Sequence, residues 1–149
     1  MKRLLFTILG IVLIAPPSGA YLRNVRGRAR HIQQADKAGI TLKQLEEMFA
    51  KMRAETNWDI DGEMVWGYFF TDPNRSKLDR LAGHLGRNGY HVLGIHDADD
   101  KSTQVLHVER IERHTPKTLH QRNTDLSKLA KQFGVESYDG MDVGPVKKN

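Results

Sequence analysis

Residues 64–73 read Met-Val-Trp-Gly-Tyr-Phe-Phe-Thr-Asp-Pro, and the prediction of the fold starts from them. Met64 to Phe70 is rich in aromatic residues and too short for a helix, which predicts a strand. Asp72 and Pro73 then predict a helix start, with Asp72 as N-cap and proline at the first helical position. A strand followed directly by a helix is the first half of a βαβ unit.

The residues after this stretch continue the same order of elements. An apolar stripe predicts a helix that ends at Asn88-Gly89, and strands are predicted at residues 90–95 and 103–113. Thr115-Pro116 repeats the cap-and-proline signal for a helix closed by Gly134, and a last strand is predicted at residues 138–143. The order βαββαβ predicts an α+β, ferredoxin-like two-layer sandwich.

An additional N-terminal helix precedes this unit. Thr41 and Gln44 form a capping-box pattern, and apolar residues at helical spacing continue to about Ala54. The predicted domain therefore covers residues 41–146. It is large enough for one core and leaves two shorter segments before it.

Residues 1–22 are predicted to be a hydrophobic signal peptide or a membrane anchor. Lys2 and Arg3 precede an apolar run, and small residues before position 20 suggest cleavage after Ala20. The uncharged residues 4–22 are also just long enough for a spanning helix, and the arginines that follow would keep the domain in the cytoplasm. A buried N-terminal helix is a third alternative.

Residues 23–40 are predicted to be a basic linker. Beside a membrane its arginines could bind anionic lipid, and a solvated tether is the alternative. These membrane-proximal residues are Arg23, Arg26, Arg28 and Arg30.

The basic charge of the chain is concentrated in this leader. Residues 1–38 carry +6, whereas residues 39–149 carry −1. A domain near neutrality has little sequence-independent attraction for phosphate, so direct binding of nucleic acid is not expected. The absence of cysteine excludes disulfides and thiolate metal sites.

No catalytic, cofactor-binding or metal-binding pattern is present in the sequence. The histidines lack the helical spacing and third ligand of a zinc site, and the acidic run from Asp97 lacks the glycine and glutamate of a calcium loop. Ser76, Ser102 and Ser127 lie in no nucleophile motif. We therefore expect a protein that is not an enzyme and that has neither cofactor nor metal.

The solvent-facing side of the sheet is the candidate binding surface. If the helices cover Val65 and Phe69, the other face would carry aromatic and charged residues typical of a protein interface. These tentative protein-binding residues are Trp66, Tyr68, His107, Glu109, Tyr138 and Asp139. Alternatively, the N-terminal helix covers these aromatic residues as core.

An RNA-binding sandwich is a further alternative for this sheet. Bases would stack on Trp66, Tyr68 or Tyr90. However, the strand at residues 104–109 reads Gln-Val-Leu-His-Val-Glu and lacks the basic and aromatic residues that such a module needs.

The C-terminal third of the chain resembles the RraB family, regulators of ribonuclease E activity. The resemblance rests on Leu-Ser-Lys-Leu-Ala-Lys-Gln-Phe-Gly-Val at residues 126–135 and on Tyr138-Asp139-Gly140, and extends over about residues 58–143. It implies a non-catalytic sandwich that binds a protein, possibly a ribonuclease or its scaffold region. The chain departs from the well-known acidic, soluble members in its near-neutral domain, its hydrophobic leader and Met141, where an aromatic residue is common.

The expectation is a non-catalytic regulatory domain, associated with a membrane through residues 4–22 and facing the cytoplasm. The alternative is an exported periplasmic binding domain, unrelated to RNA turnover, that is cleaved after Ala20.

Overall fold

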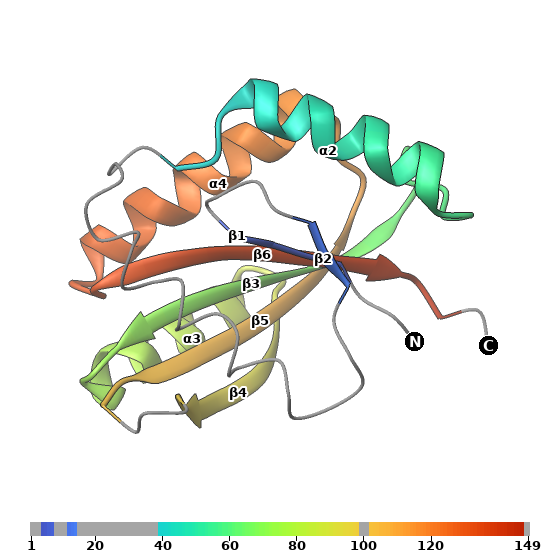
Figure 1. Cartoon of the computed structure of the whole chain (residues 1–149). Coiled ribbons are helices and arrows are strands. Elements are labelled where there is room, and N and C mark those ends of the chain that lie inside the picture. The colour runs from blue at the N-terminus through green and yellow to red at the C-terminus, as the bar shows by residue number, and fades with distance from the viewer. Residues whose placement is uncertain (1–3, 8–11, 15–38, 99–101, 148–149) are drawn as a thin grey trace.

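The computed structural model describes residues 4–7, 12–14, 39–98 and 102–147. It confirms the α+β sandwich and the additional N-terminal helix (Figure 1). The helices are α2 (Leu42–Glu55), α3 (Arg75–Arg87) and α4 (Pro116–Gln132). The strands are β1 (Leu4–Thr7), β2 (Val12–Ile14), β3 (Met64–Asp72), β4 (His91–Asp97), β5 (Gln104–Glu112) and β6 (Ser137–Pro145).

The sheet has the strand order β2-β1-β6-β3-β5-β4, and neighbouring strands are antiparallel. Its part β6-β3-β5-β4 is the order expected for a ferredoxin-like βαββαβ unit. β3 is central in this unit, so its side chains have strands on both sides.

The hydrophobic leader contributes two short strands to this sheet. β1 lies beside β6, with Leu4 opposite Val143, and β2 lies outside β1. Among the residues that the model covers, no helix combines the length and the apolar character needed to cross a bilayer. The four membrane-proximal arginines of the predicted linker lie outside the described residues. Cleavage and anchoring therefore stay predictions.

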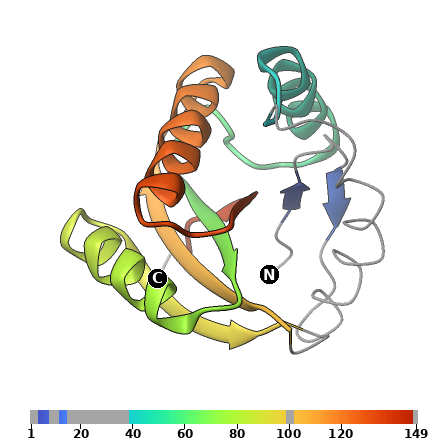
Figure 2. The ribbon, with the colours of Figure 1, turned by 90° about the vertical axis from the view of Figure 1, so that its left-hand side faces the viewer.

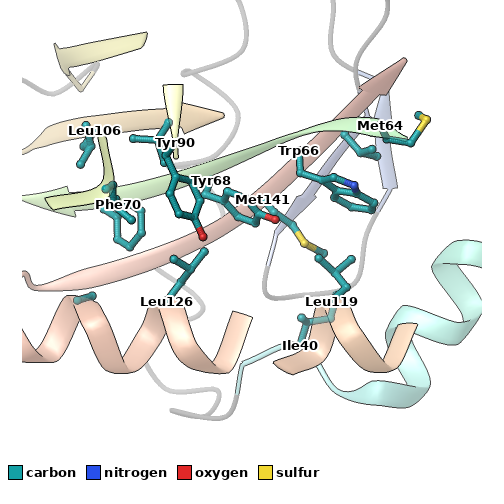
Figure 3. Packing of buried hydrophobic residues seen from close by; sticks show 14 of the residues in the cluster. Ile40, Met64, Trp66, Tyr68, Phe70, Tyr90, Leu106, Leu119, Leu126 and Met141 are labelled. Carbon is teal, nitrogen blue, oxygen red and sulfur yellow. The ribbon is translucent and has the colours of Figure 1, made fainter. Parts of the chain in front are cut away.

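The helices cover one face of the sheet (Figure 2). Alternate residues of β3 point toward them, namely Met64, Trp66, Tyr68 and Phe70, and all four are buried. Figure 3 shows the three aromatic rings of this set, with Leu119 and Leu126 of α4 on the helix side. Each large side chain buried in this way stabilises the fold by about 1.5–3 kcal/mol, which fixes the register of β3.

The predicted caps of α2 and α4 are confirmed. The Thr41 side chain accepts from the Gln44 backbone N–H at 3.2 Å, while the Gln44 side chain accepts from the Thr41 N–H at 2.8 Å. Thr115 caps α4 in the same reciprocal way with Thr118, and Pro116 is its first residue. Both caps supply partners to backbone N–H groups that the helix itself leaves unpaired.

The predicted cap of α3 is wrong by two residues. Asn74, not Asp72, is the N-cap, and its side chain accepts from the Ser76 N–H at 3.0 Å. Asp72 is buried at the end of β3 and accepts from the backbone N–H groups of Asn74 and Glu136 at 2.7 and 2.8 Å. Because the Asp72 carboxylate is hydrogen-bonded to the backbone just before β6, a different side chain caps the helix.

Candidate functional site

The two aromatic residues at the centre of the predicted binding face lie in the core. Trp66 and Tyr68 are both 0% exposed, and Phe49 of α2 stacks on Trp66 with ring centroids 6.1 Å apart. The expectation that they face a partner is therefore wrong, and so is its premise that the sandwich helices cover Val65 and Phe69. The alternative, in which the two rings belong to the core, is confirmed, and the N-terminal helix packs on Trp66. The reason is that they share their face with Met64 and Phe70, which gives this side the larger apolar surface.

The three rings on which RNA bases were expected to stack are all buried. Tyr90 is buried like Trp66 and Tyr68, and its ring lies 6.0 Å from that of Tyr68. Bases cannot stack on rings that the helices cover.

The Tyr-Asp-Gly signal of β6 has a structural role. The Tyr138 hydroxyl donates to Asn123 Oδ1 of α4 at 2.7 Å, and burial raises the pKa of Tyr138 well above its usual value. The register of β6 against β3 shifts here, so that Asp139 is the extra residue of a β-bulge. Gly140 follows with φ +116°, a conformation that glycine adopts without strain.

His107 and Glu109 lie together on the face opposite the helices. Both are half-buried, and His107 Nε2 is 3.8 Å from Glu109 Oε1. The His107 ring stacks on Phe69 with centroids 4.3 Å apart. Of the six predicted protein-binding residues, these two are the pair that the fold brings together on one surface.

Asp142 belongs to the same surface and was not predicted. It is buried opposite Gly67 in the β3–β6 ladder. A Cβ on Gly67 would lie 2.1 Å from Asp142 Oδ1 and 2.8 Å from His107 Nε2, so the missing side chain makes room for both. A glycine inside an aromatic-rich strand was the available signal, since such a glycine often marks a close approach.

The opposite face carries polar and charged side chains beside an apolar one. It combines an imidazole, two carboxylates and the apolar Ile111, which is 53% exposed. Across the described part of the chain, histidines and acidic residues form no group of three or more that could hold a metal ion.

A second polar cluster lies under the helices, centred on Glu112. Its carboxylate accepts from the Tyr68 hydroxyl at 3.0 Å and from Arg122 of α4, and lies 3.0 Å from His114 Nε2. Burial alone would raise the pKa of Glu112, but His114 and the charge of Arg122 outweigh it and lower the pKa to about 2.

Sequence reasoning also missed the Glu112 cluster. Its members lie up to 54 residues apart, from Tyr68 to Arg122, and no local pattern brings them together. The available signal was period 2 in β5, because Glu112 falls on the same face as the buried Leu106 and Val108. A carboxylate at a helix-facing position implies charged or hydrogen-bonding partners.

The comparison with protein families agrees with the resemblance of the C-terminal third. The family model described as regulator of ribonuclease activity B, RraB, matches residues 42–143. No curated protein matches the sequence. The matched range runs from the start of α2 into β6 and covers more than half of the chain. The chain therefore belongs to the RraB family.

Proposed function

We propose that this protein is a non-catalytic regulatory domain that binds another protein, and that the partner is ribonuclease E or its scaffold region. The observation that carries the proposal is the family match over residues 42–143, whose description is a regulator of ribonuclease activity. The match takes in the three helices and the four strands of the sandwich, so the unit with which the family is associated is present in this chain.

The polar clusters of the domain have structural roles. The Glu112 carboxylate is engaged by Tyr68, His114 and Arg122, and the buried Asp72 carboxylate is engaged by two backbone N–H groups and Lys77. These groups hold strands and helices together, so their partners are parts of the fold itself.

The binding surface of this proposal is the face opposite the helices. His107 and Glu109 supply polar contacts there, and the exposed Ile111 supplies an apolar one. An exposed apolar side chain next to charged groups has the composition of protein interfaces. Trp66 and Tyr68, which were predicted to lie on the binding surface, are excluded from it because they are core residues.

The test measures the binding of the purified full chain to purified ribonuclease E by biolayer interferometry. A saturable complex, together with a changed rate of RNA cleavage as the regulator is added, is expected. If no complex forms and the cleavage rate is constant, the ribonuclease is not the partner.

A matched pair of variants tests the surface. Ile111→Glu places a charge on the opposite face, whereas Leu42→Glu places one at the 38% exposed start of α2. We expect Ile111→Glu to weaken the complex about tenfold and Leu42→Glu to leave it unchanged. Equal affinities of the two variants would exclude the opposite face.

The location of the protein is a separate proposal. Membrane association through residues 4–22 would require β1 and β2, which pair with β6, to leave the sheet. Cell fractionation with N-terminal sequencing tests this, and an intact chain in the cytoplasm-facing membrane fraction is expected. A mature chain that begins at Tyr21 in the periplasm would support export, and would exclude a cytoplasmic ribonuclease as partner.

A further inference from the structure

The charge of the domain is strongly segregated. α3 and α4 together contain eight lysines and arginines but two aspartates, a net charge of +6, although residues 39–149 as a whole carry −1. The rest of residues 39–149 therefore carries −7. Both helices lie on the same side of the sheet (Figure 2), so one side of the domain is basic.

Most of these cations are exposed and lack acidic partners. Five of the eight are exposed and, within the described ranges, form no ion pair, namely Arg80, Arg87, Lys117, Lys128 and Lys131. α2 differs, since its lysines pair with glutamates one turn away, as in Lys43–Glu47 and Lys51–Glu55. The positive charge on α3 and α4 is therefore available to a molecule in solution.

Two arginines beside Tyr90, Arg110 of β5 and Arg122 of α4, are held in fixed positions. The guanidinium carbons of Arg110 and Arg122 lie 5.2 and 5.9 Å from the centre of the Tyr90 ring, within the range of a cation–π contact. Arg110 also donates to the Asn88 carbonyl at the end of α3 at 3.4 Å. Both arginines keep part of their surface exposed, and they share one carboxylate, that of Glu112.

One carboxylate cannot neutralise two guanidinium groups, so this pair has an excess of positive charge. Each guanidinium has five N–H donors in a planar fork, and both side chains are partly exposed, although Arg122 Nε itself is buried. The fork matches the geometry of a carboxylate, and prior positioning of the side chains lowers the entropy lost on binding.

We propose that this basic face, made by Arg80, Arg87, Arg110, Arg122 and Lys128, docks an acidic segment of the protein partner. The inference rests on the proposed function in that the domain binds a protein. It adds a second surface, on the helix side of the sheet, and the chemistry of the segment that docks there. An acidic peptide fits better than RNA because Tyr90, the ring that the two arginines flank, is buried, so no base can stack on it beside them.

The probe is an oligoglutamate peptide of about ten residues, which when extended is long enough to follow α4. The test variant is Arg87→Glu with Lys128→Glu. The matched control is Lys43→Glu with Lys51→Glu, which makes the same change in net charge on α2. All four positions are exposed, so circular dichroism should show the same folded state for both variants.

We expect the wild-type protein to bind the peptide with an affinity that falls as salt is raised. The test variant should bind about tenfold more weakly and the control within about twofold of the wild type. Equal losses in the two variants would overturn the inference, because net charge alone would then explain binding. Tighter binding of an oligouridylate of the same charge, or no binding of the peptide, would also overturn it.

The same variants distinguish this inference from the proposed function. If ribonuclease E binds the wild type and the test variant equally well, the basic face is not its docking surface, while the regulatory function stands. If ribonuclease E does not bind the wild type, the proposed partner is wrong, and the comparison of peptide affinities still decides whether the basic face takes acidic segments.

Discussion

Tyr68 donates a hydrogen bond of 3.0 Å to Glu112, and this contact joins the middle of β3 to the end of β5 beneath the helices. The carboxylate that accepts it also lies 3.0 Å from His114 Nε2, just before α4 begins. One partly buried carboxylate thus connects the central strand, its neighbour and the entry to a helix. It also explains how a tyrosine and a glutamate are accommodated at helix-facing positions.

Replacing Tyr68 with phenylalanine removes the hydroxyl but keeps the ring. We expect the free energy of unfolding to fall by about 1–2 kcal/mol, because a hydrogen bond to a charged group is lost and the carboxylate keeps its burial. Urea denaturation measures the change. Ile111→Ala, at an exposed position of the neighbouring strand, is the control and should change stability by less than about 0.5 kcal/mol. Equal stabilities of Tyr68→Phe and the wild type would show that the contact contributes nothing.

The lowered pKa of Glu112 predicts a loss of stability in acid. Its pKa is about 2 in the folded protein against 4.5 for an unperturbed glutamate. A depressed pKa means that the stabilisation is complete above about pH 4.5 and is lost as the pH falls toward 2. After allowance for solvent screening, we expect this group to account for about 2 kcal/mol.

Glu112→Gln isolates this contribution from those of the other carboxylates. The glutamine variant should be less stable than the wild type at pH 7, and the difference between the two should shrink as the pH falls from about 5 to 2. Unfolding by urea at a series of pH values gives both curves. A difference that is independent of pH would contradict the ionic role of Glu112.

The order of helices and strands could be predicted from the sequence because it depends on local signals. Thr41 with Gln44 and Thr115 with Pro116 are caps whose partners lie within one helical turn. The match of elements to a βαββαβ unit then followed from their order, and the sheet order agrees with it.

The face that each strand presents could not be predicted in the same way. Trp66 and Val65 are both apolar, so alternation alone did not say which of them the helices cover. The Glu112 cluster depends on distant parts of the chain, and the basic side formed by α3 and α4 was hidden in a domain charge of −1. These features depend on the packing of elements, which a local pattern does not contain.

Asp72 is predicted to be the most important carboxylate for joining β3 to β6. It accepts from the N–H groups of Asn74 and Glu136 and lies 3.2 Å from Lys77 Nζ, which together lower its pKa even though burial would raise it. We expect Asp72→Ala to reduce the free energy of unfolding by about 2–3 kcal/mol, because two backbone donors lose their acceptor.

Asp72→Asn separates the hydrogen bonds from the charge. It keeps an oxygen acceptor and should lose less stability than Asp72→Ala in thermal or urea unfolding. Two variants of equal stability would show that the negative charge, and not the bonding of the backbone, is what the position supplies.

The last prediction concerns the close approach of Asp142 to Gly67. A methyl group on Gly67 would require the Asp142 carboxylate and the His107 ring to move, because their atoms occupy its position. We expect Gly67→Ala to lower the free energy of unfolding by about 1–3 kcal/mol, the usual cost of an extra group in a packed region. If the cost arises from this overlap, it should be smaller in a protein that also carries Asp142→Ala.

A double-mutant cycle measures that difference. Urea unfolding of Gly67→Ala, Asp142→Ala and the double variant should give a coupling free energy of about 1 kcal/mol, in the sense that the second substitution relieves the first. Gly86→Ala on α3 is the control, because a Cβ there would make only an ordinary contact with Val92 at 3.7 Å. Additive effects of the two substitutions would show that Gly67 is required by the backbone of β3. Coupling would show instead that glycine is required to make room for the Asp142 carboxylate opposite. That room is what allows Asp142 and His107 to lie side by side on the face opposite the helices.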